Sequence, residues 1–455
     1  LCVVSWGAVV LELAYGRILS VALAPYFAAV VVTLAVAGRG AGAWLVQALP
    51  GRFTADALDR HLAIAMALLS ATAILSEVMF LEHITLAQTL SSQDLVLLTV
   101  TIAAFSVPAF LSGLCTTLVT VHGGPHLGAL YGARYFGTAL GFLTAVAACS
   151  LLPAPLVPPL VAAVVGWTAL VTAADAGISL RAPAAACVFA FLFGLIWSST
   201  PHVFRMLQVK HWPEPYTESE AWSADARVGV FQSGPDATAA QTLPLARPPD
   251  AYTDPRPPSF KWIDVDGTNW QPLLRFDGNL EPLAFLRDSI VYAAHHLRAP
   301  ASVLLVGVGG GRDVLAAKAF GQPRVVGLED SALVREIVEH RYDYVSGRPY
   351  ELPGVQVLVG DLRGRLARSA DTFDIVQLGP ATGGTLGGLL PIGNYLLTRE
   401  AVAEYRRHLN PQGLLSVTLP FLPEYPFEVL RLLRTLREVW SAHGATDPGQ
   451  PLVVL

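Results

Sequence analysis

The run Gly307–Gly311 has the composition and spacing that best suit ligand binding in this chain of 455 residues. It follows the apolar run Ser302–Val306, which predicts a buried strand, and it precedes a helical pattern over Val314–Phe320. A glycine turn between a strand and a helix lets a ligand approach backbone N–H groups at the positive end of the helix. The pattern therefore predicts a nucleotide-binding loop.

Two acidic residues follow the next two apolar runs. Arg324–Leu328 predicts a second strand that ends at Glu329, 22 residues after Gly307, where a carboxylate can accept both hydroxyls of a ribose. Val355–Val359 predicts a third strand, and Asp361 after it is placed for an adenine amino group. The predicted cofactor contacts are Gly307, Gly309, Gly310, Gly311, Asp313, Glu329 and Asp361.

Arg312 distinguishes between two kinds of nucleotide loop. The dinucleotide pattern G-x-G-x-x-G needs Gly or Ala at the position that Arg312 occupies. The spacing of Gly307, Gly309 and Gly311 instead suits the loop with which S-adenosylmethionine-type folds hold the amino-acid end of the cofactor. A Rossmann-like domain with an empty site is the alternative interpretation.

The segment after a predicted fourth strand would line the substrate side of the site. The run Phe373–Leu378 predicts that strand, and the glycine-rich stretch 379–388 follows it. A helix over Arg399–Leu409, a turn at 411–413 and a strand over Leu414–Leu419 continue the alternation, which requires a mostly parallel sheet covered on both faces. The candidate substrate residues are Gln377, Asn394 and Tyr395, and for the last two core packing is an equal alternative.

The charge distribution indicates that these elements are only part of the molecule. Hydrophobic residues make up 53% of the chain and charged residues 14%, against about 25% charged in soluble domains. Residues 1–200 carry 13 of the 65 charged side chains. This partition excludes a single soluble domain, a secreted disulfide scaffold and a disordered protein. A net charge of −5 without a basic run argues against nucleic acid as a partner.

The apolar half predicts a bundle of membrane-spanning helices. Seven stretches reach the roughly 20 apolar residues that a spanning helix needs, near residues 1–20, 23–49, 62–81, 95–121, 128–151, 156–175 and 183–200. Recurring glycines, as in 38–42 and at 132, 137 and 141, predict close helix–helix contact. We therefore expect a transmembrane domain over 1–200, a linker and small β-rich subdomain over 201–300, and a Rossmann-like methyltransferase-type domain over 301–455.

A few charged residues interrupt these apolar stretches, and charges inside a membrane are costly. They are Glu12, Arg17, Arg39, Glu77 and Arg134. One interpretation is a polar site that recognises a charged substrate. The other is internal salt bridging, or arginine side chains that reach to the interface.

The segment between the two halves predicts strands and one helix. Short strands are expected over Val228–Gln232, Phe260–Val265 and Leu273–Asp277, and a helix over Leu283–Leu297. The pair His295-His296 near the end of that helix has no further ligands at suitable spacing, so no metal site is predicted.

These motifs together resemble the bacterial membrane-fused spermidine/spermine synthase-like proteins. The resemblance covers nearly the whole chain and is carried by the stretches Glu12–Arg17, Gly38–Gly42, Trp222–Val228, Gly307–Asp313, Gly327–Glu329 and Asn394–Thr398. It implies that the soluble domain binds S-adenosylmethionine or its decarboxylated form. The glycines would lie against the cofactor tail, Glu329 would hold the ribose and Asp361 the adenine.

One position departs from that family. Its aminopropyltransferases place a catalytic Asp just after the fourth strand, where it orients and deprotonates the attacking amine. Here the region reads Gln377-Leu378-Gly379-Pro380-Ala381, without an acid before Glu400. The acidic pocket that would hold a polyamine chain is not evident either. Polyamine synthesis is therefore uncertain on this sequence, and no catalytic residue is assigned.

The sequence leaves two functions open. The first is an alkyl transfer, aminopropyl or methyl, from a sulfonium cofactor to a small-molecule amine or another nucleophile. The second is a non-catalytic transporter or scaffold with a degenerate nucleotide-sensing domain. We expect a lipid bilayer around the helices, a homodimer through the soluble domain and a location in the bacterial inner membrane. Cofactor supply favours a cytoplasmic soluble domain, whereas seven spans and the arginine distribution favour the other side.

Overall fold

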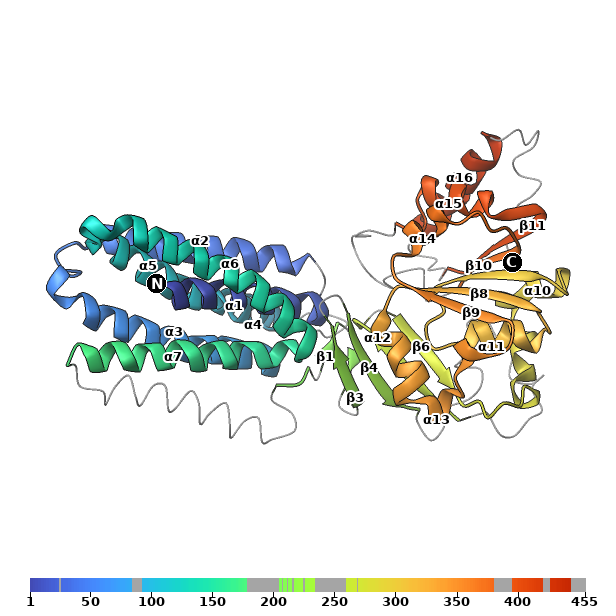
Figure 1. The fold of residues 1–455 in the computed structure, drawn as a ribbon, viewed down its shortest axis with the longest axis horizontal. Coiled ribbons are helices and arrows are strands. Elements are labelled where there is room, and N and C mark those ends of the chain that lie inside the picture. Colours follow the sequence, from blue (N-terminus) through green and yellow to red (C-terminus); the bar gives the residue numbers. More distant parts are fainter. Residues whose placement is uncertain are drawn as a thin grey trace. The chain divides into compact units, whose positions relative to one another are not determined.

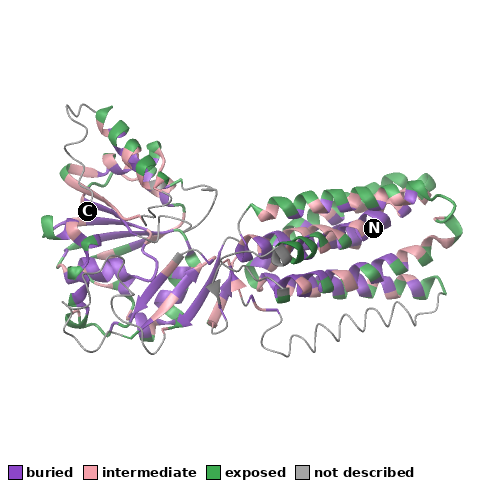
Figure 2. Ribbon diagram, turned by 180° about the vertical axis from the view of Figure 1, so that it is seen from behind, coloured by how far each residue is buried: buried purple, intermediate pink, exposed green. Residues whose placement is uncertain are grey.

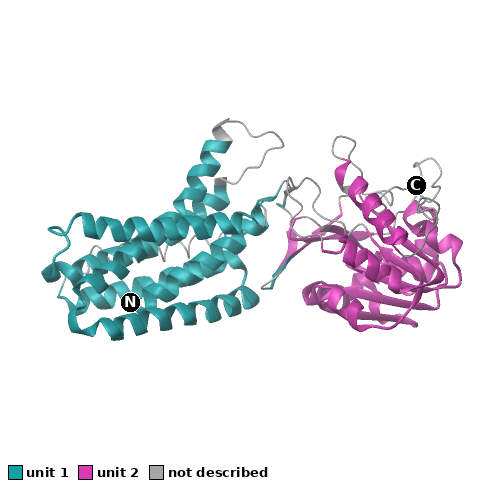
Figure 3. Ribbon diagram, turned by 90° about the horizontal axis from the view of Figure 1, so that it is seen from above, with its two compact units in different colours: residues 1–215, 221–227 teal, residues 216–220, 228–455 magenta. Residues whose placement is uncertain are grey.

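The computed structural model describes residues 1–23, 26–83, 92–177, 204–206, 208–210, 212–214, 217–223, 226–233, 259–267, 269–379, 395–419 and 426–442. They form two compact units, Leu1–Pro215 with Ala221–Arg227, and Tyr216–Glu220 with Val228–Leu455 (Figure 3). The predicted seventh helix near 183–200 and the candidate residue Asn394 lie outside the described residues.

The first unit is a bundle of apolar helices (Figure 1). The helices are α1 (Cys2–Ala22), α2 (Phe27–Ala48), α3 (Leu58–His83), α4 (Ser92–Ala104), α5 (Ser106–His122), α6 (Leu127–Leu151) and α7 (Val157–Asp175). Six helical stretches in the described residues are long and apolar enough to cross a membrane, with α4 and α5 together making one of them. They coincide with the first six predicted spans.

Glycines bring the backbones of these helices close together, as the sequence predicts. A Cβ atom added to Gly38 of α2 would lie 2.6 Å from the Ser106 carbonyl oxygen of α5. One added to Gly141 of α6 would lie 2.9 Å from the Trp6 carbonyl oxygen of α1. Close backbone approach of this kind replaces the hydrophobic effect as the source of helix association in lipid.

The outer surface of the bundle is apolar. Exposed residues occur along its helices (Figure 2), and many of them have large hydrophobic side chains. They include Trp44, Phe136, Leu143, Leu151 and Trp167, each at least 65% exposed. Many exposed large apolar side chains on long helices are typical of contact with lipid.

The charges inside the bundle have different surroundings. Arg39 Nη1 and Glu12 Oε2 form an ion pair at 2.8 Å, which supports the salt-bridge interpretation for these two residues. The Arg17 guanidinium lies 5.7 Å from the centre of the Trp222 ring. Glu77 is fully buried, and neither of its carboxylate oxygens has a hydrogen-bond partner in the described part of the chain. Arg134 is partly exposed on α6.

Two small antiparallel sheets follow the bundle in the sequence. One pairs β1 (Gln208–Val209) with β2 (Trp212–Pro213). The other has the order β3-β4-β5-β6, with strands β3 (Thr217–Trp222), β4 (Arg227–Gln232), β5 (Phe260–Val265) and β6 (Asn269–Leu274). The last strand lies about three residues earlier than the sequence predicts.

The predicted helix over Leu283–Leu297 is wrong as a single element. The structure has two 3₁₀ segments, η5 (Glu281–Asp288) and η6 (Ile290–Tyr292), followed by the short α10 (Ala293–Leu297). Ser289 separates the two segments because its backbone is extended, with ψ at 132°, and its hydroxyl accepts from the Val291 N–H. The break turns the chain so that the Tyr292 side chain is buried.

The second unit contains a five-stranded parallel sheet with helices on both faces (Figure 1). Its strands β7 (Ser302–Val306), β8 (Arg324–Glu329), β9 (Val355–Val359), β10 (Phe373–Leu378) and β11 (Leu409–Val417) have the order β11-β10-β7-β8-β9. Counted along the chain this is 5-4-1-2-3, a Rossmann-like order. It confirms the predicted α/β class and places the reversal of strand order at β7.

The helices of this unit begin after the strands that position the site. They are α11 (Arg312–Ala319), α12 (Ala332–Glu336), α13 (Asp343–Ser346), α14 (Leu362–Arg368), α15 (Arg399–Arg407) and α16 (Phe427–Ser441). Leu362 and Tyr405 of α14 and α15 share a core with Leu304 of β7. The predicted turn at 411–413 falls inside β11, where the pairing with β10 jumps from Leu409 to Leu414 and leaves a bulge.

Candidate functional site

The glycine turn joins β7 to α11 in a backbone conformation that other residues rarely adopt. The φ angles of Gly307, Gly309 and Gly311 are 77°, 48° and 85°, which lie in the left-handed region that glycine enters without steric cost. The Gly307 N–H donates to the Leu328 carbonyl oxygen at 2.9 Å. The turn is thereby anchored to β8, the strand that ends at Glu329.

Glu329 lies directly against the turn. Its Oε2 accepts a hydrogen bond from the Gly309 N–H at 2.8 Å, and its Oε1 accepts one from the Ser331 N–H at 3.1 Å. The residue is 4% exposed. An ionised carboxylate offers about four acceptor positions, so two remain for the hydroxyl groups of a ligand. The structure thus brings together the predicted glycines and the predicted ribose-binding acid.

Burial, together with the negative charge of Asp330 and a hydrogen bond to it, raises the pKa of Glu329 from 4.5 to about 8. The two N–H donors act in the opposite direction because they stabilise the charged form. A ligand that donates hydroxyl hydrogens to Glu329 would also favour its ionised form. Ligand binding is therefore expected to release a proton near neutral pH.

Gln271 of β6 covers the turn from the small sheet. Its Oε1 accepts from the Gly310 N–H at 2.8 Å. A Cβ atom added to Gly309 would overlap the Gln271 amide, and one added to Gly310 would lie 2.5 Å from the Pro272 carbonyl oxygen. The sequence analysis missed Gln271, since only its place just after the Asp-Gly turn of a hairpin pointed to it. The glycines are needed for this close approach as well as for the backbone conformation.

Pro349 and Tyr350, in the 3₁₀ segment η8 (Pro349–Glu351), close another side of the turn. The Tyr350 hydroxyl donates to the Gly309 carbonyl oxygen. A Cβ atom added to Gly311 would lie 2.5 Å from Pro349 Cγ. The turn is therefore enclosed by residues from β6, β8 and η8.

Asp361 follows β9, and the Tyr395 carbonyl oxygen accepts from Arg363 Nη1 of α14 at 3.4 Å. Asp361 is exposed and immediately precedes α14. Partial burial raises the pKa of Tyr395, and the negative charges of Asp330 and Asp361 add to this effect. The segment that carries Tyr395 therefore lies beside α14, the helix that begins after Asp361.

Asp313 is held by two donors at the start of α11. Its Oδ1 accepts from the Tyr292 hydroxyl at 2.7 Å and from Arg312 Nε at 3.1 Å. Burial raises the pKa of Tyr292 well above 10, so the phenol stays protonated and donates. The Asp313 side chain is 7% exposed. Tyr292 was not a candidate in the sequence analysis, because no local pattern marks it.

Gln377 is part of a buried hydrogen-bond network. Its Oε1 accepts from His295 Nε2 at 2.8 Å, and Gln322 Nε2 lies 3.2 Å from His295 Nδ1. An amide oxygen only accepts, so the proton of His295 is on Nε2. Burial lowers the pKa of His295 and keeps the ring neutral. Gln377 is 1% exposed, and its contacts connect β10 to the segment that carries Tyr292.

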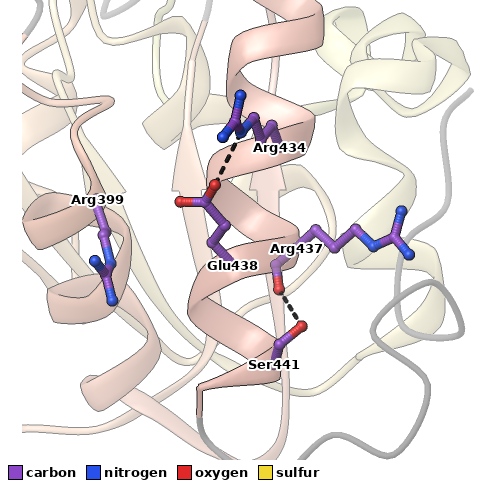
Figure 4. Close-up of a pocket in the computed structure, with 5 residues that line it drawn as sticks. All are labelled: Arg399, Arg434, Arg437, Glu438 and Ser441. Atoms are coloured by element: carbon purple, nitrogen blue, oxygen red, sulfur yellow. Dashed lines mark hydrogen bonds and ion pairs between the residues drawn. The ribbon is translucent and has the colours of Figure 1, made fainter.

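An open groove of about 480 Å³ lies between α15 and α16 (Figure 4). Arg399, Arg434, Arg437, Glu438 and Ser441 line it. Arg434 Nε donates to Glu438 Oε1 at 2.9 Å, and Arg434 is 82% exposed. None of these residues belongs to the predicted site. In the described residues, no three potential metal ligands among His, Cys, Asp and Glu lie together.

Comparisons with known proteins add a distant structural likeness. No protein-family model and no curated protein matches the sequence. Among solved structures, a spermidine synthase in complex with the transition-state analogue AdoDATO has 14% identity and a TM-score of 0.32. The spermidine synthase of Thermotoga maritima has 15% identity and a TM-score of 0.33. Each alignment covers 50% of this chain and 63% or 64% of the other. Likeness at this level says nothing about activity.

Proposed function

We propose that this protein is a membrane-anchored transferase whose α/β unit binds S-adenosylmethionine or its decarboxylated form and alkylates an amine or another nucleophile. The observation that carries the proposal is the pairing of the glycine turn with Glu329. A left-handed glycine turn at the reversal of strand order is where open α/β sheets bind nucleotides. The two hydrogen bonds at 2.8 and 3.1 Å hold the carboxylate beside that turn.

The residues around the turn suggest how the cofactor would lie. Glu329 would accept the two ribose hydroxyls, and Asp361 with Tyr395 would lie beside the adenine. The Gln271 amide is within hydrogen-bonding distance of the turn, so it would contact the amino-acid or aminopropyl end. The sulfonium centre is already activated, so the protein would act mainly by aligning the two reactants, which supplies several kcal/mol.

Calorimetry on the purified full chain tests the cofactor site. S-adenosylmethionine, decarboxylated S-adenosylmethionine and methylthioadenosine are titrated separately, and saturable binding of at least one is expected. Glu329→Gln should weaken the binding. Glu336→Gln is the matched control because this acid is half exposed in a surface ion pair. The absence of heat with all three ligands, on protein that unfolds cooperatively, would refute the proposal.

A second function has one observation in its favour. No acid lies between the end of β10 and Glu400, where an aminopropyltransferase would supply one, and Gly379 follows the strand instead. This favours a sensor that binds the adenosyl ligand without turning it over and reports to the membrane helices. Tight ligand binding without methylthioadenosine release from decarboxylated S-adenosylmethionine and putrescine or spermidine would support the sensor, or a methyltransferase with another acceptor.

We also propose that the helical unit inserts into the bacterial inner membrane with the α/β unit in the cytoplasm. The six apolar helices and their apolar outer surface support insertion. The side follows from the cytosolic supply of adenosyl cofactors. A reporter fused after Leu455 tests it, and a periplasmic signal would contradict the transferase.

A further inference from the structure

The transferase proposed above needs a proton acceptor near the end of β10. The acid on this strand, Asp374, is at the other end and is already engaged. Its Oδ2 accepts from the Ser302 N–H at 2.8 Å and the Ser302 hydroxyl at 2.7 Å, and its Oδ1 accepts from Asn410 at 2.7 Å. A carboxylate for the chemistry must therefore come from another element.

Asp313 of α11 occupies the space beside Gly379, the residue that follows β10. A Cβ atom added to Gly379 would overlap Asp313 Oδ2. A glycine at 379 is thus what leaves room for the carboxylate. The oxygen of Asp313 lies where the side chain of an acid at the strand end would begin. The end of β10 carries no acid, and Asp313 of α11 places a carboxylate oxygen at that position.

The surroundings of Asp313 fix which oxygen faces Gly379. The Tyr292 hydroxyl and Arg312 Nε both donate to Oδ1. These two bonds hold the carboxylate plane and leave Oδ2 directed at the end of β10. Tyr292 is itself fully buried, so the arrangement is preorganised rather than adopted on binding.

We propose that Asp313 is the catalytic residue that orients the attacking amine and accepts its proton. The inference rests on the proposed transferase function. The amine nitrogen attacks the carbon bound to the sulfonium sulfur, and the new N–C bond forms as the C–S bond breaks. The bonding pair stays on sulfur, which leaves as a neutral thioether. The proton of the amine passes to Asp313 Oδ2, so charge and atoms balance.

The test uses the full chain with decarboxylated S-adenosylmethionine and either putrescine or spermidine. Methylthioadenosine release is followed between pH 6 and 9, and cofactor binding is measured by calorimetry. Asp313→Asn preserves the shape of the side chain, so the loss of cofactor binding, for which Asp313 is itself a predicted contact, should be smaller than the loss of rate. The rate should fall by about 100-fold or more, the usual contribution of a general base. Asp343→Asn, an acid of a surface ion pair, is the matched control and should leave the rate unchanged.

A double variant that moves the carboxylate, the swap variant, tests whether its position, rather than a contribution of Asp313 to folding, accounts for the rate. Asp313→Gly with Gly379→Asp moves the carboxylate from α11 to the end of β10. It should regain at least about tenfold of the rate lost by Asp313→Asn. A merely structural Asp313 would not give this rescue, nor would its replacement change the pH profile of the rate.

The outcomes distinguish the inference from the proposed function. Normal turnover by Asp313→Asn overturns the role of Asp313 and leaves the transferase intact. Cofactor binding by the wild type without methylthioadenosine release from either amine overturns the role of Asp313 and favours the sensor or a methyltransferase. Absence of cofactor binding overturns both. If Asp313→Asn fails to fold, the swap variant decides, and an inactive but folded swap variant overturns the inference.

Discussion

Glycines permit close approach in both units, but what approaches them differs. A Cβ atom added to Gly42 of α2 would overlap the Phe110 carbonyl oxygen and lie 2.7 Å from the Leu114 nitrogen, both in the backbone of α5. One added to Gly309 would overlap the side-chain amide of Gln271. A helix backbone cannot move without moving the whole helix, whereas a side chain can be shortened. Gly42 therefore fixes a contact between two helix backbones, whereas Gly309 fixes a contact with a side chain at the site.

The largest expected effect is in the bundle. Gly42→Ala should destabilise the folded protein by about 3 kcal/mol, because the methyl group has to push α5 away. Thermal unfolding in detergent measures the change. Gly40→Ala is the matched control on the same helix, since a Cβ atom there has nothing within 4 Å. Equal effects of the two variants would show that α2 and α5 do not pack as described.

In the glycine turn, a destabilising substitution of Gly309 should be partly rescued by a second substitution that shortens Gln271. Gly309→Ala is expected to cost about 2–3 kcal/mol, partly from the positive φ of 48° and partly from the overlap with Gln271. Adding Gln271→Ala should recover the part due to overlap. Gly321 has a φ of 73° and no atom within 4 Å of an added Cβ. Gly321→Ala should therefore show the loss of stability caused by the positive φ alone. A double variant no more stable than Gly309→Ala would place Gln271 elsewhere.

The features of the site that the sequence predicts are those encoded in a single segment of the chain. An apolar run followed by glycines or an acid defines both a strand and its end, so β7, β8, β9 and β10 appear within one residue of their predicted bounds. The same reasoning found Gly307 and Glu329. It also found the first six apolar helices, because their length and composition are properties of a single segment.

What the sequence missed depends on contacts between distant segments. Gln271 and Gly310 are 39 residues apart, and Asp313 and Gly379 belong to different elements. Sequence spacing carries no information on such pairs before the fold is known. The broken helix at Ser289 was missed because its apolar pattern suits a helix, while a single extended residue redirects the chain.

The acid of the turn should control ligand affinity. Glu329→Gln is expected to weaken adenosyl binding by about 10- to 100-fold, because an amide oxygen accepts ribose hydroxyls less strongly than a carboxylate. Glutamine has one acceptor oxygen in place of two, so one of the Gly309 and Ser331 N–H groups loses its acceptor. The variant should therefore also be somewhat less stable. Calorimetry with Glu336→Gln as the control separates the two effects. Unchanged affinity would remove Glu329 from the ligand site.

The raised pKa of Glu329 predicts a pH dependence of stability. The folded state holds the proton more tightly than the unfolded state, so between pH 4.5 and about 8 the free energy of unfolding should fall as pH rises. Below this window both states are protonated, and above it both are ionised. The slope should be about 1.4 kcal/mol per pH unit at most. Glu329→Gln should flatten the profile, and an unchanged profile would assign the dependence to other groups.

The smallest expected changes in stability are in the bundle, for substitutions of a paired and of an unpaired charged residue. Arg39→Gln leaves Glu12 without its partner at 2.8 Å, and a loss of about 1 kcal/mol is expected because the pair is partly exposed. The double variant with Glu12→Gln should recover most of it, since no isolated charge then remains. Glu77→Gln should cost less than Arg39→Gln, because neither of its oxygens has a partner in the described residues to lose. A larger cost for Glu77→Gln would show that this buried acid has a role that its surroundings in the bundle do not reveal.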